Sequence, residues 1–460
     1  MEDSIADRLK AVMRTPPWGR FQVHGVRFLD RMNGSALLAD SCGLGKSWQT
    51  IGFLRLRPEL RPALIICPSG VKYAWKQQLM EHSSLECEVA ESKRPYPLRG
   101  NIWVINYDIL HDWAPWFLKQ GIAQVVCDEA HRIGNLSAKR TIAARAIAKK
   151  AQRFIALSGT PVRNRPYEFF SMLNLIAPQV FPSIREYAYA YCGPRRVLGH
   201  WVFDGATRLE ELHEKIKPFM LRRLKSEVMT ELPVTNRQMI PVQIHMKEYI
   251  KARNDFIAWL LQNKGADAAR RAQSAEKIVR MGHLKRLAAF GKLKAIKTWI
   301  EDFFLDNPDQ KLLVFSVHRE MTFNLEREFP NALKIIGGMT AAQKFQIVNE
   351  YQTNPEKSLL LGNIQAAGEG TTLTAGSTMA FTELSWVPAE HEQAEGRQNR
   401  IGQKSEHLDA FYFVATGTIE EDIVDILQSK SSVIGQIVDG RPEEHVMNLI
   451  IKRLLDKHAA

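Results

Sequence analysis

The sequence predicts an α/β fold in which two lobes, each built on a parallel sheet flanked by helices, are joined by a mostly helical middle. Short apolar runs alternate with stretches of helical periodicity, and this alternation occurs twice along the chain. Alternating strands and helices imply crossover connections, which make the strands parallel. In the first lobe the apolar runs lie at 36–40, 63–68, 101–107, 124–131 and 153–161.

The alternation pauses at about 165–300, where apolar residues recur at helical spacing. It resumes with apolar runs at 311–317, 333–338, 358–363, 378–384 and 407–414. We therefore expect a first lobe at 1–235 with a helical protrusion from about 165, a helical, basic linker or protrusion at 236–300, a second lobe at 301–435, and a C-terminal helix at 436–460.

Composition narrows the class of protein. A chain of 460 residues suggests two or three domains. The net charge of +12 favours a polyanionic partner such as nucleic acid, although an acidic protein or a membrane surface also fits. Between 264 and 297 Lys and Arg far outnumber Asp and Glu, which fits either a solvated helix face or a groove wall that follows phosphates.

The cysteines and the N-terminus point to a reduced compartment. The five cysteines include no C-x-x-C pair, so neither a zinc site nor a disulfide framework is predicted. The first residues are acidic where a signal peptide is basic, and no apolar run approaches ~20 residues. We expect an intracellular, cytoplasmic protein, associated with the nucleoid in a bacterium or present in the host cytoplasm for a virus.

A phosphate-binding loop is predicted where a strand meets a helix. Gly45, Lys46 and Ser47 match the end of G-x-x-x-x-G-K-[ST], but Asp40 stands at the first glycine position. A helix N-terminus offers free N–H groups and the positive end of its dipole. Gly43 and Gly45 permit close backbone approach, Lys46 can reach the β- and γ-phosphates, and Ser47 can ligate Mg²⁺.

Asp128 and Glu129 follow a buried strand at its carboxyl end, where α/β sheets place their ligands. Asp128 would hold Mg²⁺ directly or through water, and Glu129 would orient and deprotonate the attacking water. A solvated acidic turn is the alternative.

Arg397 and Arg400 lie three residues apart, so on a helix they would share one face. An isolated arginine pair is usually a surface feature. Opposite a nucleotide held by the first lobe, the two would instead act as arginine fingers when the lobes close.

With these three elements in order, the chain resembles the superfamily-two helicase-like ATPases, and specifically the Swi/Snf-type DNA translocases, over roughly residues 18–430. The match is nearest to the branch that includes annealing helicases, and no accessory domain can be fitted into the remaining residues. The strings that carry the resemblance are ADSCGLGKS from residue 39, DEAH from 128, LSGTP from 157, FMLRRLKSEVMTELP from 219 and the block 363–403.

The resemblance implies two RecA-like lobes, ATP and Mg²⁺ as cofactors, and roles for further residues. Gln22 would read the adenine edge, and the nucleotide would also contact Leu44 and Gly370. Lobe closure would be relayed by His131, Ser158, Thr160 and Gln393. The DNA backbone would contact Ser69, Tyr107, Ser316, Gly368 and Trp386. Packing is an alternative for Trp386 and for Trp18, which could instead flank the adenine, and a structural role is an alternative for His131.

The implied activity is ATP hydrolysis coupled to movement along double-stranded DNA, with remodelling of DNA or of DNA–protein complexes as its outcome and strand annealing as one form of it. Binding should rest on phosphates and be largely independent of sequence, with forked or single-stranded regions as further partners. A strand-separating DNA or RNA helicase and a non-catalytic nucleic-acid-binding scaffold are the alternatives.

Overall fold

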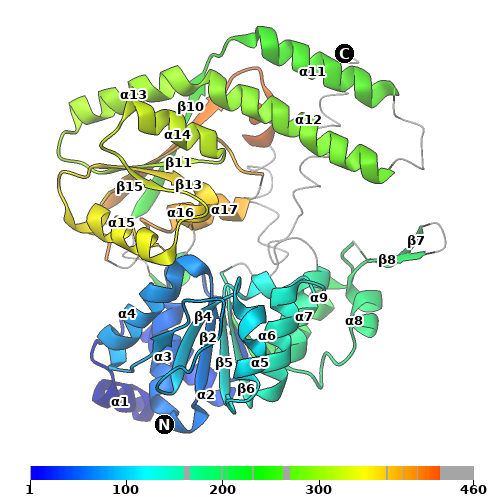
Figure 1. Cartoon of the computed structure of the whole chain (residues 1–460), viewed down its shortest axis with the longest axis vertical. Helices are drawn as coiled ribbons and strands as arrows, with labels where there is room; N and C mark the ends of the chain where they lie inside the picture. Colours follow the sequence, from blue (N-terminus) through cyan, green and yellow to red (C-terminus); the bar gives the residue numbers. More distant parts are fainter. Residues whose placement is uncertain are drawn as a thin grey trace. The chain divides into compact units, whose positions relative to one another are not determined.

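A computed structural model describes most of the chain (Figure 1). The described residues are 2–159, 166–197, 200–203, 205–229, 233–262, 270–368, 371–386, 388–400 and 402–424. Most of the chain divides into two compact units at Leu232 and Pro233, and these units are the first and second lobes. The C-terminal helix expected at 436–460 lies outside the described residues.

The first lobe is built on a seven-stranded sheet with the order β3-β4-β2-β5-β6-β1-β9, in which every pair of neighbours is parallel. The five strands that the sequence predicts are all present. The strands are β1 (Ala36–Leu38), β2 (Ala63–Cys67), β3 (Glu88–Val89), β4 (Ile102–Asn106), β5 (Gln124–Asp128), β6 (Arg153–Leu157) and β9 (Met220–Leu221). Strands β2 and β4 are buried along their whole length, which explains their uninterrupted apolar sequence.

Helices cover both faces of this sheet (Figure 1). One face packs against α1 (Glu2–Val12), α2 (Arg20–Arg31), α3 (Lys46–Leu56) and α4 (Lys72–Ser83). The other face packs against α5 (Leu110–Phe117), α6 (Lys139–Lys150) and α7 (Pro166–Ile176). The region expected as a helical protrusion holds α7, α8 (Ile184–Tyr191), α9 (Leu209–Ile216) and α10 (Lys225–Val228), and also an unpredicted hairpin of β7 (Arg195–Val197) and β8 (His200–Val202).

The second lobe has a six-stranded parallel sheet with the order β10-β15-β14-β11-β13-β12. Its predicted strands are β11 (Leu312–Ser316), β12 (Leu333–Ile335), β13 (Leu359–Asn363), β14 (Thr378–Phe381) and β15 (His407–Ala415). The segment 236–300 is not wholly helical as expected, because β10 (Val234–Val242) pairs with β15 along nine residues. This edge strand contains Pro241 and is mostly exposed, so it lacks the apolar run of a buried strand.

Helices also cover both faces of the second sheet (Figure 1). They are α11 (Met246–Gln262), α12 (Arg270–Gly291), α13 (Leu293–Asp306), α14 (Arg319–Glu328), α15 (Ala341–Thr353), α16 (Ile364–Gly368) and α17 (Pro388–Glu395). Helices α13 and α14 pack on one face, whereas α16 and α17 pack on the other. A two-lobed α/β fold of parallel sheets is therefore confirmed.

Candidate nucleotide site and nucleic-acid interface

The predicted phosphate loop connects β1 to α3. Gly43 has φ +93° and Gly45 has φ +70°, a left-handed backbone that favours glycine. A Cβ on Gly45 would lie 2.1 Å from Nε2 of Gln22, so the loop has no room for a side chain there. Lys46 Nζ donates to the carbonyls of Asp40 at 2.7 Å and Ser41 at 3.3 Å, which holds its charge over the loop. A phosphate oxygen can replace those contacts.

Asp40 replaces the first glycine of the usual pattern because its carboxylate ties the loop to the rest of the lobe. The carboxylate is fully buried and accepts from Arg223 Nε at 3.0 Å and Nη2 at 2.5 Å, and from Gln49 Nε2 at 3.1 Å. Arg223 also donates to the Phe21 carbonyl at 2.5 Å. Arg223 and Gln49 were not predicted as loop-positioning residues, although the Arg-rich string from residue 219 was an available signal for Arg223.

Gln22 lies under the phosphate loop rather than at the surface. It is 1% exposed, and its Oε1 accepts from the Trp18 backbone N–H at 2.8 Å. Adenine recognition by Gln22 therefore stays a prediction, and the amide would have to exchange this contact. Trp18 is 65% exposed, which does not favour its interpretation as a packing residue.

The acidic pair lies at the carboxyl end of β5. Asp128 Oδ2 accepts from Trp75 Nε1 at 2.9 Å, and its Oδ1 accepts from the Glu129 N–H at 3.0 Å. Burial by the surrounding chain, together with the charge of Glu129, raises the pKa of Asp128 to about 6. Glu129 has φ +50°, a strained conformation for a non-glycine residue that is typical of functional sites.

These donors fit Mg²⁺. The negative charge of Glu129 helps to raise the pKa of Asp128, and a divalent cation would offset the charge of this acidic pair. The Ser47 hydroxyl, in the first turn of α3, supplies the neutral oxygen that accompanies carboxylate in magnesium sites. Among the described residues no cluster of three His, Cys, Asp or Glu side chains could hold a metal. Phosphate oxygens and water would complete the ligands of Mg²⁺ at such a site.

The expected coupling residues of the first lobe lie together. His131 Nδ1 is 3.2 Å from Ser158 Oγ and 3.2 Å from Glu129 Oε2, so the imidazole links the acidic pair to the segment after β6. A Cβ on Gly159 would lie 2.7 Å from Cys42 Sγ, which places this segment against the phosphate loop. Thr160 lies outside the described residues.

Two expected DNA contacts of the first lobe have different environments. Tyr107 is 1% exposed and its hydroxyl donates to the Asp128 carbonyl at 2.7 Å, so its DNA contact stays a prediction that the burial of this side chain does not support. Tyr107 instead supports the strand end that carries the acidic pair. Ser69 is half-buried at the start of the short helix Ser69–Val71, and its role as a phosphate contact stays a prediction.

In the second lobe, Arg397 and Arg400 lie beyond α17, which ends at Glu395, so the expectation that they share a helix face is wrong. Their side chains nevertheless converge on one atom. Arg397 Nη1 lies 3.4 Å and Arg400 Nη1 3.0 Å from the Thr371 carbonyl, and Arg397 Nε donates to the Gln393 carbonyl at 3.1 Å. Arg397 is 6% exposed and Arg400 is half-buried.

A buried carboxylate fixes the position of this arginine segment. Glu395 accepts from Arg237 Nε at 2.7 Å and Nη2 at 2.6 Å, and from the Tyr412 hydroxyl at 2.6 Å. Asn399 donates to Thr235 Oγ1 at 3.0 Å. The segment is thus tied to β10 and β15, and Asn399 has a structural role.

The other second-lobe residues with predicted roles are buried or packed against the core of the lobe. Ser316 is 2% exposed and accepts from Thr382 Oγ1 at 3.1 Å, and Gly368 is buried, so the DNA contacts expected of both stay predictions that their burial does not support. Trp386 packs against the core of the lobe, with Lys285 Nζ 4.9 Å from its ring centroid. Gln393 is buried, which leaves its coupling role a prediction, and Gly370 lies outside the described residues.

The basic run at 264–297 is not one continuous phosphate-facing surface. Lys292 is fully buried and donates to Glu420 at 2.7 Å, and Lys285 is 2% exposed. Arg280 lies over the Trp259 ring at 5.2 Å. These cations therefore stabilise the second lobe itself.

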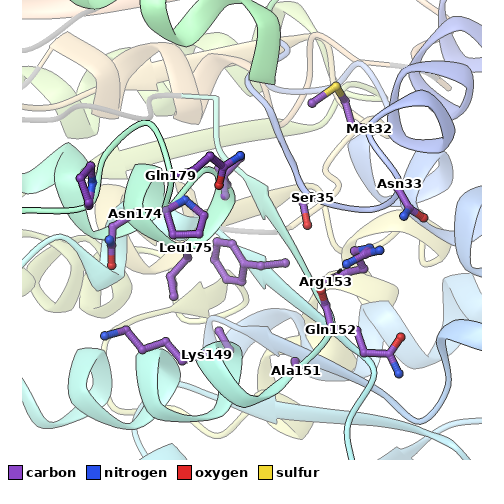
Figure 2. Close-up of a pocket in the computed structure, with 15 residues that line it drawn as sticks. Met32, Asn33, Ser35, Lys149, Ala151, Gln152, Arg153, Asn174, Leu175 and Gln179 are labelled. Carbon is purple, nitrogen blue, oxygen red and sulfur yellow. Dashed lines mark hydrogen bonds between the residues drawn. The ribbon is translucent and has the colours of Figure 1, made fainter.

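A cavity of about 720 Å³ lies at the amino ends of β1 and β6 in the first sheet (Figure 2). It is lined by residues just before β1, such as Ser35, and by residues at the start of β6, such as Arg153. The phosphate loop follows the carboxyl end of β1, so this cavity is not the candidate nucleotide site.

No helix among the described residues has the length and hydropathy needed to cross a membrane.

Comparison with known proteins decides the family. Residues 21–289 match the model of the SNF2-related domain, and residues 291–402 match the helicase conserved C-terminal domain. The chain belongs to the SNF2-related family. The resemblance to this family, and to its annealing-helicase branch, is confirmed.

Among its relatives, the human DNA annealing helicase and endonuclease ZRANB3 is 32% identical over 96% of this chain and 42% of its own length. A Caenorhabditis elegans homologue of the SWI/SNF-related matrix-associated actin-dependent regulator of chromatin subfamily A-like protein 1 is 30% identical over 91% of this chain and 61% of its own length. The chain thus spans about two fifths of the ZRANB3 relative. The SWI2/SNF2 ATPase core of Sulfolobus solfataricus in complex with dsDNA aligns with a TM-score of 0.45 at 23% identity, covering 96% of this chain and 97% of that one.

Proposed function

We propose that this SNF2-related protein is a DNA-dependent ATPase that couples ATP hydrolysis to translocation along double-stranded DNA. One observation carries the proposal: a glycine-built phosphate loop with Lys46 follows β1, while the acidic pair follows β5 in the same sheet. Strands β1 and β5 both pair with β6, so their carboxyl ends lie at one edge. The proposed setting is inside the cell, where ATP and duplex DNA are both present.

In the proposed reaction Lys46 and the N–H groups at the start of α3 bind the β- and γ-phosphates. Ser47 and Asp128 would hold Mg²⁺, which supplies charge neutralisation at the transferring phosphoryl group. Glu129 accepts the proton of the attacking water, and His131 orients the Glu129 carboxylate. Arg397 and Arg400 would stabilise the transition-state charge once the lobes close, exchanging the Thr371 carbonyl for phosphate oxygen.

The proposed partner is duplex DNA held through its phosphates, with forked or single-stranded regions as further elements of the substrate. One relative supports this choice, since ZRANB3 is named as a DNA annealing helicase. A motor that moves along DNA has to bind every sequence similarly, so phosphate contacts should dominate. The logarithm of affinity should then fall with log salt by about 0.9 per phosphate neutralised.

The test is ATP turnover of the full chain with blunt duplex, forked duplex, single-stranded DNA and RNA as activators. We expect stimulation by blunt duplex of any sequence, and loss of turnover in Lys46→Ala. Stimulation by RNA or single-stranded DNA without a response to duplex would instead support a strand-separating helicase. No turnover with any activator, together with parental DNA binding by Lys46→Ala, would support the non-catalytic scaffold.

A further inference from the structure

The β7–β8 hairpin has no part in the proposed nucleotide site, yet its construction is specific. It projects from the first lobe beyond α8 (Figure 1). Arg196 pairs directly with Trp201 across the two strands, so both side chains leave the same face of the hairpin. A two-stranded hairpin is marginally stable by itself, so this one needs support from its neighbours.

That support comes from a cluster of three rings. The Tyr189 ring of α8 lies 5.0 Å from Trp201 and 5.1 Å from Phe203 between centroids, in edge-to-face geometry at 70° and 76°. Trp201 and Phe203 are two residues apart and nearly parallel, at 21°. Trp201 nonetheless remains 45% exposed, so the cluster orients this ring without burying it.

The base of the hairpin is fixed to the end of α8. A Cβ on Gly193, which has φ +53°, would lie 2.8 Å from the Gly205 Cα, so the two flanking segments touch through their backbones. The Gly205 N–H donates to the Cys192 carbonyl at 3.0 Å, and Thr207 Oγ1 donates to the Ala190 carbonyl at 3.0 Å. The segments that flank the hairpin are therefore held against each other and against the end of α8.

Cations accompany the exposed rings. The Arg196 guanidinium lies 5.4 Å from the Trp201 ring centroid, and the Arg185 guanidinium lies 6.0 Å from that of Tyr189. Both arginines are exposed. An oriented, partly exposed indole beside exposed guanidinium groups matches the chemistry of single-stranded nucleic-acid sites, where bases stack on aromatic rings and cations attract the backbone.

We propose that Trp201 and Arg196 form a stacking platform for unpaired DNA bases at a fork. The proposal rests on the proposed function, because it assigns the hairpin to the same DNA substrate. Paired bases inside a duplex do not offer their faces, so blunt duplex should gain little from Trp201. The platform would therefore favour DNA with an unpaired strand over fully paired DNA.

The test compares binding of a labelled forked duplex, bearing thymidine arms, with binding of a blunt duplex of equal length to the full chain. Trp201→Ala should lose about 5- to 150-fold in affinity for the fork, the equivalent of ~1–3 kcal/mol per stacked base, with blunt-duplex affinity and ATP turnover unchanged. Trp201→Phe should retain part of the affinity for the fork, because phenylalanine keeps an aromatic ring. Ile142→Ala, which removes an exposed apolar side chain on α6 of the same lobe, should behave like the parent.

Arg196→Ala should weaken fork binding and lower its salt dependence by about 0.7 in the log–log slope, whereas Trp201→Ala should leave that slope unchanged. Equal affinity of parent and Trp201→Ala for the fork would overturn the platform, as would equal losses on fork and blunt duplex. ATP turnover stimulated by blunt duplex tests the proposed function separately. If the proposed function is wrong, the parent itself will show no stimulation by blunt duplex.

Discussion

The buried ion pair between Asp40 and Arg223 should be a principal stabiliser of the phosphate loop. The Asp40 side chain is 0% exposed and that of Arg223 is 11% exposed. Arg223→Met removes two of the three side-chain donors that surround the carboxylate and leaves only Gln49. Removing one partner of a buried pair costs about 3–5 kcal/mol, and we expect Arg223→Met to lower the free energy of unfolding of the first lobe by that amount.

The assay is a double-mutant cycle with Asp40→Asn. Because the chain has two lobes, the readout is hydrogen exchange of backbone amides in β1 and α3, which reports opening of the first lobe rather than one global transition. The double variant should lose less free energy of unfolding than the two single variants together, by at least ~1.5 kcal/mol. The reason is that the double variant contains no unpaired buried charge.

The control is Arg57→Met in the same lobe. Arg57 Nε contacts Asp30 at 2.6 Å, but the two side chains are 32% and 18% exposed, so we expect a loss below ~1 kcal/mol. Two results would refute a stabilising role of the buried Asp40–Arg223 pair. One is that the stability losses of the two single variants add within ~0.5 kcal/mol, and the other is that Arg223→Met costs as little as Arg57→Met.

Three further predictions concern the candidate nucleotide site. Lys46→Ala should lower duplex-stimulated turnover by about 10²–10³-fold in a steady-state ATPase assay, because it removes a preorganised charge from the phosphates, while Lys76→Ala on α4 should leave turnover unchanged. The pKa of Asp128 is raised from 3.8 to about 6, so in the absence of Mg²⁺ its neutral form stabilises the folded chain at low pH. This contribution, at most about 3 kcal/mol, should be lost as the pH rises from 4 through 6. Urea titrations should show this decrease in the free energy of unfolding in the parent and not in Asp128→Asn. Trp75→Phe deletes a donor that holds this pKa down, so the acidic limb of the pH–turnover profile should move to higher pH, and an unmoved limb would contradict the assigned hydrogen bond.

Strands with apolar runs could be predicted from the sequence because their burial determines their composition. Strand β2 is buried at every position, and its apolar run predicts its position. Strand β10 could not be found in this way, because most of its residues are exposed and its formation depends on pairing with β15, far along the chain. The hairpin of β7 and β8 is equally hidden, since three-residue strands leave almost no periodicity.

The chemistry-bearing residues of the loop and of β5 could be predicted because they lie within short motifs. Their supports could not, since Arg223 reaches Asp40 across 183 residues of sequence. The DNA contacts of Tyr107 and Ser316 were expected only from the family resemblance, which gives no information on burial, and both side chains are buried and hydrogen-bonded. Sequence spacing also placed Arg397 and Arg400 on a helix, although α17 ends before them.

The claim on which the proposed function depends is that both lobes contribute to hydrolysis of one nucleotide. The most direct measurement is duplex-stimulated turnover of Arg400→Ala, with Arg319→Ala on α14 of the same lobe as control and with binding of a non-hydrolysable ATP analogue measured in parallel. We expect turnover to fall about 10³–10⁵-fold while affinity for the analogue without DNA changes little, because an arginine finger acts on the transition state. Turnover equal to that of the parent would contradict the claim.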